Sequence, residues 1–553
     1  MSDTTWTLRG GTIVDGTGQP AGSGNVIVEH DRIVAVGSTD ILGTVLDIDG
    51  LVVAPGFVDI HSHGDWIAPL ADGPGLFGPN VRQGITTTVA GNCGISPAPL
   101  ASGAIGAVER MPLAAATTDR LAWNWRSVAE FFQQIEQRGL PLNLCMYVGH
   151  STLRATVMGD AARPPTPREL AAMQQLLDEG MREGAAGLSI GLEYFPGRYA
   201  GPSEISALAA LLPAHGALLA AHVRGISALY DAAMAEAIAI AEDTRCRLQI
   251  AHVNPMGPAN WGAIDGLFAR IDAARAHGLD VGYDIVTYVA WTISVLDLLP
   301  YAVQELGADA VLALAESEDG RAHLRRQIEG ARPVWPPWIE QRVTRNIVLE
   351  MGWDALVLAD PAAEAFAADR GATLAELARR RERDPYDMLF ELLRASRGRA
   401  QLVNVGYGGT FHDETPLRRL IQRPDAIPET DTIPVRGSDG ALQLNLPLFY
   451  GTMARFLGHF CRDQGLLDLP AAIHRITALP AQRLRLQDRG VLRAGAYADL
   501  TIFNPAQIQD SGTFLQPLPA RGIVHVFVNG RPTVRDTVYD PARLAGRVVR
   551  RVS

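Results

Sequence analysis

The stretch GFVDIHSH, residues 56–63, determines the fold class that we expect for this chain. It closes an apolar run and contains His61 and His63, two positions apart. Residues i and i+2 of a β-strand point to the same face. In a barrel of parallel strands this face is the interior, and active sites lie at the carboxyl ends of the strands. Two imidazoles placed there can bind one metal ion, so the pair predicts a metal site inside a barrel.

Two further histidines end strand-like runs. His222 ends GALLAAH (216–222), and His252 ends RCRLQIAH (245–252). They are 30 residues apart, which is the length of about one βα unit. Three protein ligands with one open position are typical of catalytic zinc. We therefore expect both histidines to join the same metal site.

The middle of the chain alternates apolar strand-like runs with helical stretches rich in Ala, Leu and Glu, such as 168–184 and 227–242. This alternation is typical of α/β folds with parallel strands. About eight βα units fit residues 52–440, which favours a TIM (β/α)8 barrel. Residues 290–400 are mainly helical, with PVWPPW in the middle, and are too long for one crossover connection. We expect them to form a helical lid insertion over the barrel mouth.

Both ends of the chain have the pattern of short strands. Apolar and polar residues alternate there, and Asn529-Gly530 is a hairpin turn signal. Neither end alone has enough strands for a stable unit. We expect one small β-sandwich domain built from residues 1–52 and 481–553, joined to a barrel domain of residues 53–480.

Composition and charge exclude several classes of protein. The net charge of -11 argues against a general nucleic-acid binder. The sequence has no stretch of 18 apolar residues and no secretory signal pattern at its N-terminus, so we expect a cytoplasmic protein that does not span a membrane. The four cysteines form no CxxC pair, which argues against a disulfide framework. A small-molecule substrate is the expected partner, and a homo-oligomer remains compatible with the sequence.

A carboxylate follows the last candidate strand. Asp439 lies in PVRGSDG, residues 434–440. At that level of a barrel, a carboxylate can take a proton from metal-bound water and pass it to a leaving nitrogen. We expect Asp439 to be the general acid and base; the alternative is a turn aspartate before Gly440.

Several longer motifs resemble those of one family. The chain resembles the amidohydrolase superfamily, and within it the D-aminoacylase (N-acyl-D-amino-acid deacylase) family, over nearly its whole length. The matching segments are GFVDIHSHGD, GITTTVAGNCGISPAP, VGHSTLR, GLSIGLEYFPGRYA, GPANWG, GSDG and YGTMARFLGHF. The resemblance implies a composite β-domain, a TIM barrel and a lid. It also implies Zn²⁺ bound by histidines and one cysteine, and hydrolysis of an N-acyl group.

The absence of lysine bears on this resemblance. All 49 basic residues are arginine, whereas many superfamily members bridge two metal ions with a carboxylated lysine. Cys93 ends GITTTVAGNC at the level of the second strand, and its thiolate is a good zinc ligand. We expect Cys93, His222 and His252 to bind one zinc ion tightly, with His61 and His63 completing a second, weaker position. The alternative for Cys93 is a buried, inert thiol.

Other residues at expected strand ends are candidates for contact with substrate. His150, in VGHSTLR, could orient substrate or polarise its carbonyl, or pack behind the site. Tyr194 and Tyr288 could contact substrate, and Glu193 could contact a second metal. Arg224, two residues after His222, could bind a substrate carboxylate through two parallel hydrogen bonds. The alternative for Arg224 is a structural arginine paired with a local acid.

The resemblance has three departures, all near the expected pocket. Asn254 stands where the family has a lysine, Ile226 and Ser227 follow the HVRG segment where it has an acid, and Leu446-Pro447-Leu448 replaces His-Pro-Arg. Loss of these polar groups predicts a more apolar or bulkier substrate. Three hypotheses therefore remain: an N-acyl (D-)amino acid deacylase, an amidohydrolase acting on a non-amino-acid amide, cyclic amide or ester, and a non-catalytic interaction protein.

Overall fold

Parallel strands form the centre of the molecule. The computed structural model describes residues 5–111, 113–339, 343–437 and 439–551. One parallel sheet has the order β6-β7-β8, and another has the order β17-β13-β12-β11-β10-β9. Their bounds are β6 Phe57–Asp59, β7 Ile85–Ala90, β8 Asn143–Met146, β9 Val148–Gly149, β10 Gly187–Gly191, β11 Leu218–His222, β12 Arg247–Ile250, β13 Val281–Val286 and β17 Ala426–Glu429. The parallel α/β pattern expected from the sequence is confirmed.

Backbone contacts connect the two parallel sheets at two places. Only Tyr147 separates β8 from β9. On the other side, the backbone N–H of Asp431 donates to His61 O at 3.0 Å, and that of His63 donates to Thr432 O at 2.7 Å. These bonds place the carboxyl ends of β6 and β17 side by side, although the two strands lie at opposite ends of the core in sequence.

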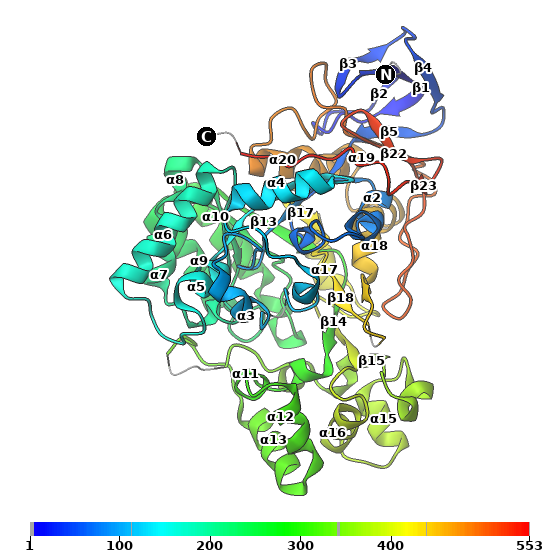
Figure 1. Cartoon of the computed structure of the whole chain (residues 1–553). Coiled ribbons are helices and arrows are strands. Elements are labelled where there is room, and N and C mark those ends of the chain that lie inside the picture. Colours follow the sequence, from blue (N-terminus) through cyan, green and yellow to red (C-terminus); the bar gives the residue numbers. More distant parts are fainter. Residues whose placement is uncertain (1–4, 112, 340–342, 438, 552–553) are drawn as a thin grey trace.

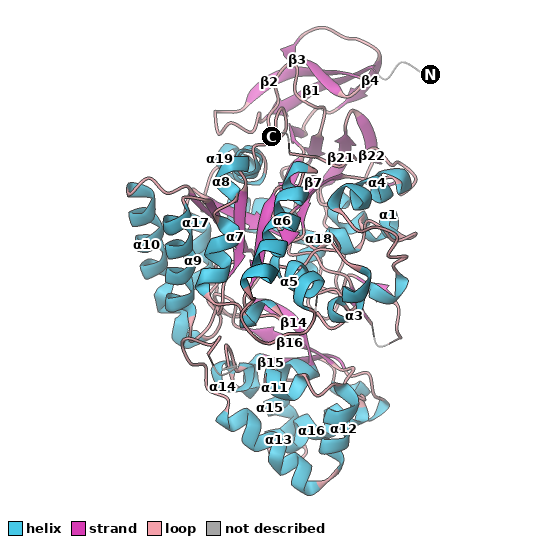
Figure 2. Ribbon diagram, turned by 60° about the vertical axis from the view of Figure 1, so that its left-hand side comes forward, coloured by secondary structure: helices cyan, strands magenta, loops and turns pink. Residues whose placement is uncertain are grey.

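Amphipathic helices cover the parallel strands (Figure 2). They include α4 (Val128–Arg138), α6 (Pro167–Arg182), α9 (Tyr230–Thr244) and α10 (Ile264–Ala276). In α6, Thr166 and Glu169 form a capping box, and the helix starts with a proline, which suits the first helical position. The helix buries Met173, Leu177 and Met181, spaced four residues apart, so one face packs toward the strands. Strands such as β7 (ITTTVA) and β11 (LLAAH) are buried along their whole length, as is typical of parallel strands that are covered on both faces.

A large insertion lies between β13 and β17. It contains the antiparallel sheet β14-β16-β15 (Ala290–Ser294, Gln401–Val405 and Leu356–Asp360). Its longer helices are α12 (Ala308–Glu316), α13 (Glu318–Gly330), α15 (Leu374–Arg380) and α16 (Pro385–Ala395). The insertion has its own apolar core, which includes Leu358, Leu389 and Leu392. It lies at the opposite end of the molecule from the terminal strands (Figure 1). The sequence suggested helices here, but not the three-stranded sheet.

Strands from both termini pair with each other. Hydrogen bonds join β1 (Thr5–Ile13), β2 (Gly22–Glu29), β3 (Arg32–Ser38), β4 (Thr44–Asp47) and β5 (Val52–Pro55) with β20 (Leu500–Phe503), β21 (Ile523–Val528), β22 (Arg531–Arg535) and β23 (Val538–Tyr539). The antiparallel pair β5–β20 connects the two sets. The result is one nine-stranded sheet built from both termini, and the sandwich arrangement expected from the sequence stays a prediction. No described helix combines the length and apolar character needed to cross a membrane.

Candidate metal centre

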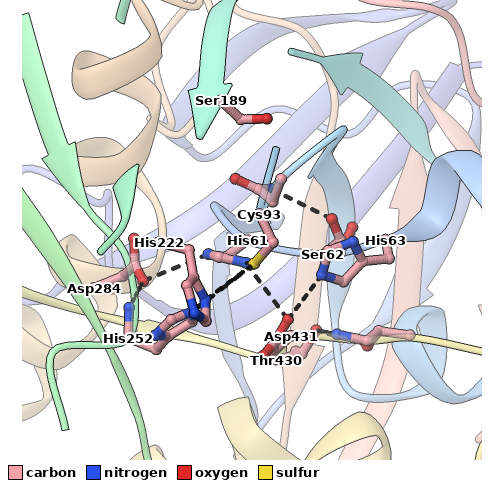
Figure 3. Close-up of polar contacts among 12 residues, drawn as sticks. His61, Ser62, His63, Cys93, Ser189, His222, His252, Asp284, Thr430 and Asp431 are labelled. Carbon is pink, nitrogen blue, oxygen red and sulfur yellow. Dashed lines mark hydrogen bonds and ion pairs between the residues drawn. The ribbon is translucent and has the colours of Figure 1, made fainter. Parts of the chain in front are cut away.

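Two overlapping groups of metal-binding side chains lie at the carboxyl ends of the parallel strands (Figure 3). The first comprises Cys93, His222 and His252, and the second comprises His61, His63, Cys93 and Asp431. In each group the candidate ligand atoms all lie within 4.8 Å of one another. Cys93 belongs to both groups. The five residues expected from the sequence to bind metal are therefore brought together, with Asp431 added to them.

The first group has nearly the spacing that a zinc ion requires. Cys93 Sγ lies 3.6 Å from His222 Nδ1 and 3.8 Å from His252 Nε2. Zn–S bonds of about 2.3 Å and Zn–N bonds of about 2.0–2.1 Å in a tetrahedron place sulfur about 3.5 Å from nitrogen and two nitrogens about 3.3 Å apart. The two imidazole nitrogens lie 2.8 Å apart, so they would separate by about half an ångström around such an ion. The donor set fits zinc after this small adjustment.

The second group surrounds one carboxylate oxygen. Asp431 Oδ1 lies 3.1 Å from His63 Nε2 and 3.4 Å from His61 Nε2. His61 Nε2 is also 3.3 Å from Cys93 Sγ. This arrangement could hold a second metal ion. It could also allow a proton to pass between the Asp431 carboxylate and one of the two histidines.

Two of these residues have an unusual backbone conformation. Cys93 has a φ of 51° and His252 a φ of 31°, in the left-handed region that non-glycine residues seldom adopt. Each residue lies just beyond the end of its strand, β7 or β12. Such a conformation costs on the order of 1–3 kcal/mol and is concentrated at functional sites. Here it accompanies the convergence of Sγ and Nε2 on a common point.

Buried carboxylates contact the outer nitrogens of the rings. Glu193 Oε2 lies 3.3 Å from His222 Nε2, the nitrogen that faces away from Cys93. Asp284 Oδ1 lies 3.7 Å from His61 Nδ1 and accepts a hydrogen bond of 2.6 Å from the backbone N–H of His252. Carboxylates in this position fix the orientation of a ligating imidazole and increase its basicity. They therefore support the ligand assignment.

Burial also sets the protonation of the ligands. It lowers the pKa of His222 and of His252 to about 3, so both are neutral imidazoles, the form that binds a metal. Burial, together with the nearby Asp431 and other acids, raises the pKa of the Cys93 thiol. A thiolate at this position therefore needs a bound cation to stabilise its charge, and a metal ion supplies one.

A cavity of about 570 Å³ opens next to both groups. On one side it is lined by Cys93, His222 and His252, and on the other by residues of the insertion such as Trp291 and Tyr301. Tyr194, expected to contact substrate, also lines it, with its ring centroid 4.6 Å from that of His222. The cavity is large enough for a small organic substrate.

Asp439 does not lie in this site, and the expectation for it is corrected. It is exposed between β18 (Val435–Arg436) and β19 (Leu442–Gln443), where its carboxylate accepts a hydrogen bond from the backbone N–H of Ala441. It is therefore a turn aspartate. The carboxylate beside the candidate metal ligands is Asp431, two residues after the end of β17. The sequence feature that predicts Asp431 is the strand AIPE, which ends directly before Thr430 and Asp431. The turn motif Ser-Asp-Gly does not mark a strand end.

Three other expected residues also lie outside the cavity lining. His150 Nε2 contacts Glu204 at 2.8 Å in a buried network that includes Arg154. Tyr288 donates its hydroxyl hydrogen to Asp510 at 3.0 Å. Arg224 makes a forked, buried ion pair with Glu236. These contacts favour the alternatives given above for His150 and Arg224, namely packing behind the site and pairing with a local acid, and a contact of any of the three residues with substrate stays a prediction.

Known proteins resemble this chain over nearly its whole length. Residues 44–534 match the model described as "Amidohydrolase family". The chain is 32% identical to an N-acyl-D-glutamate deacylase of Alcaligenes xylosoxydans xylosoxydans, over 98% of this chain and 96% of the relative. It is also 32% identical to a D-aminoacylase of the same organism, over 99% and 97%.

Two solved structures also resemble this chain over nearly its whole length. A D-aminoacylase structure superposes with a TM-score of 0.76 at 30% identity, covering 99% of both chains. An N-acyl-D-glutamate deacylase of Bordetella bronchiseptica, complexed with zinc and a phosphonate that mimics the tetrahedral intermediate, superposes with a TM-score of 0.77 at 28% identity, again over 99% of both chains.

Proposed function

Because this chain belongs to the amidohydrolase family, we propose that it is a zinc-dependent hydrolase that cleaves N-acyl amino acids at the amide bond. The observation that carries this proposal is the convergence of Cys93, His222 and His252 on one point beside a cavity. The D-amino acid derivatives hydrolysed by the relatives are the first compounds to test.

The ligand roles follow from the two groups of side chains. Cys93, His222 and His252 would hold one zinc ion, and His61 and His63 would form a second position with Asp431. A bound zinc ion polarises a substrate carbonyl and makes a water molecule more acidic. Glu193 holds the His222 ring so that Nδ1 faces Cys93.

Asp431 is the proposed general base and acid. Its carboxylate lies beside the ligands and lines the cavity. Burial opposes its ionisation, but His61 and His63 lower the pKa of Asp431, so it is a carboxylate able to accept a proton from the attacking water. The protonated group then gives this proton to the leaving nitrogen, which departs as an amine.

The finer architecture belongs to the same proposal. The parallel strands would form one closed (β/α)8 barrel, which the bonds between residues 61–63 and 431–432 support. The insertion within residues 290–400 would act as a lid, since it supplies part of the cavity lining. The barrel domain would span 53–480, with the terminal strands of 1–52 and 481–553 forming a separate domain.

One observation favours a second candidate, hydrolysis of an amide without an amino acid carboxylate. Asn254 replaces the lysine expected from the family resemblance and lines the cavity. Its side-chain amide donates to Val286 O and accepts from Val286 N–H, both at 2.9 Å, so Asn254 offers no cation to substrate. Leu446 and Leu448, which replace polar residues, are buried.

A substrate screen separates the two candidates. The purified, zinc-loaded protein is incubated with N-acetyl-D-amino acids, N-acetyl-L-amino acids and neutral amides, and the released amine is quantified. Hydrolysis of N-acyl amino acids supports the first candidate, and hydrolysis of neutral amides alone supports the second. Absence of hydrolysis across the panel contradicts both.

A further inference from the structure

We propose that Arg345, a residue of the insertion, is the anion anchor of the cavity and binds the carboxylate of an N-acyl amino acid. This inference rests on the proposed function and specifies its substrate class: an N-acyl amino acid with an apolar or aromatic side chain. Arg345 would take the role of the family lysine, which this chain lacks. It would also take the role expected for Arg224, whose guanidinium forms an ion pair with Glu236.

The guanidinium of Arg345 lies close to the metal ligands. It lines the same cavity as Cys93 and His222. Its Nη1 is 3.6 Å from Glu193 Oε2, and this same oxygen is 3.3 Å from His222 Nε2. One side chain therefore separates Arg345 from a ligand. In an N-acyl amino acid the carboxylate carbon is two bonds from the amide nitrogen, so its anion must also bind close to the metal centre.

Within the part of the chain that the structure describes, Arg345 has hydrogen-bonding capacity left for a ligand. Its distance of 3.6 Å from Glu193 exceeds the usual 2.7–3.2 Å of an N–H···O bond. The other Glu193 oxygen, Oε1, and the Tyr301 hydroxyl are buried without a hydrogen-bond partner among the described residues. A second acid that faces the guanidinium, Asp297, accepts a hydrogen bond from the Ser294 backbone N–H at 2.8 Å. Unpaired buried polar groups around a cation point to an absent polar ligand.

The other arginine of the cavity lining differs in this respect. Among the described residues, the lining contains two arginines, Arg345 and Arg436. Arg436 donates hydrogen bonds to the Asp119 carboxylate and to Gly440 O. The side chain of Arg345 is only 16% exposed, whereas that of Arg436 is 36% exposed. A carboxylate bound at Arg345 would thus be largely removed from water, where a charge-assisted hydrogen bond is strong.

Aromatic side chains complete the recognition site. Tyr194, Tyr301, Tyr407 and Trp291 line the cavity together with Arg345. They supply apolar ring surface for an organic side chain, while the guanidinium supplies the charge. This combination fits a substrate that is anionic at one end and apolar elsewhere. It agrees with the two positions where Asn254 stands in place of the family lysine and Leu446 in place of the family histidine.

Equilibrium binding tests the anchor without relying on turnover. Zinc-loaded protein carrying Asp431→Asn is titrated by calorimetry with racemic N-acetylphenylalanine and with its racemic carboxamide. We expect the carboxylate to bind more tightly. Adding Arg345→Gln should weaken carboxylate binding by about 10- to 100-fold, the range for hydrogen bonds to charged groups, and change carboxamide binding less than about 3-fold. Arg436→Gln is the matched control and should leave both affinities within about 3-fold.

The outcomes distinguish this inference from the proposed function. Equal weakening of both probes by Arg345→Gln, or no carboxylate preference before that change, overturns the anchor even if the unmodified protein hydrolyses amides. A carboxylate preference that depends on Arg345, in a protein that hydrolyses no amide, supports the anchor and contradicts the proposed function. Circular dichroism of each variant identifies a loss of fold, in which case Arg345→Lys provides the second test: it keeps the charge but loses the forked geometry, and should weaken the carboxylate selectively.

Discussion

His63 Nε2 and Asp431 Oδ1 lie 3.1 Å apart, although 368 residues separate them in the chain. The contact exists because β6 and β17 end side by side, where the His63 N–H bonds to Thr432 O. It brings a carboxylate to the metal-binding histidines from the last parallel strand of the core. The chemistry that we propose depends on this relationship.

Replacing Asp431 with asparagine should remove proton transfer while keeping the shape of the side chain. We expect kcat to fall by about 10²- to 10⁴-fold, the usual contribution of general acid–base catalysis. The zinc ion of the first position should stay bound, because Cys93, His222 and His252 remain. Steady-state kinetics and elemental analysis measure the two quantities. Asp439→Asn is the matched control and should leave kcat unchanged, because Asp439 is exposed in a turn.

Cys93→Ala should remove the ligand shared by both groups. Because a thiolate supplies one of three ligands and the negative charge, we expect a large loss of bound zinc, measured by mass spectrometry of the metal after gel filtration. Cys461→Ala is the control, since Cys461 lies in the segment η9 (Phe456–Asp463) and belongs to neither ligand group among the described residues. Undiminished zinc in Cys93→Ala would remove Cys93 from the ligand set.

Glu193→Gln tests the contact behind His222. The amide cannot supply the negative charge that orients and polarises the imidazole, so zinc affinity should fall by about 10- to 100-fold. Competition against a chromophoric chelator measures this affinity. Glu350→Gln is a suitable comparison, because Glu350 is a partly buried acid that accepts hydrogen bonds from the backbone N–H groups of Ala228 and Asn346. An unchanged affinity in Glu193→Gln would reduce Glu193 to a packing role.

The insertion should be more mobile than the parallel strands. It has a separate apolar core and supplies one wall of the cavity, as expected of a segment that opens and closes over a site. Hydrogen exchange should therefore be faster in α12, α13 and α16 than in β7, β11 and β12. Binding of N-acetylphenylalanine to the Asp431→Asn protein should slow exchange near Trp291 and Tyr301. Equal protection of insertion and strands would argue against a lid.

The convergence of the candidate ligands could be predicted because it follows from a local rule. His61, His63, Cys93, His222 and His252 each lie at or just after the end of an apolar run, and parallel strands bring such ends to one edge. Asp431 follows the same rule. The Ser-Asp-Gly motif, however, led to the prediction of Asp439, which lies eight residues later. Asp439 lies between β18 and β19 of a hairpin that follows β17, and so it is farther from the strand end.

Side-chain direction and distant contacts could not be predicted in this way. Arg224 is two residues from a ligand, but it turns toward Glu236 on α9. Arg345 is 93 residues after His252 in sequence, and only the packing of the insertion against the strands brings it to the cavity. The joining of the terminal strands in one sheet likewise depends on β5 pairing with β20, nearly 450 residues away.

The most direct test of the account is metal-dependent amide hydrolysis. Protein stripped with a chelator and dialysed is assayed for amine release from N-acetyl-D-amino acids, before and after one equivalent of zinc is added. We expect negligible release from the stripped protein and full recovery with zinc, and no recovery in Cys93→Ala. Equal hydrolysis by stripped and zinc-loaded protein would contradict the account.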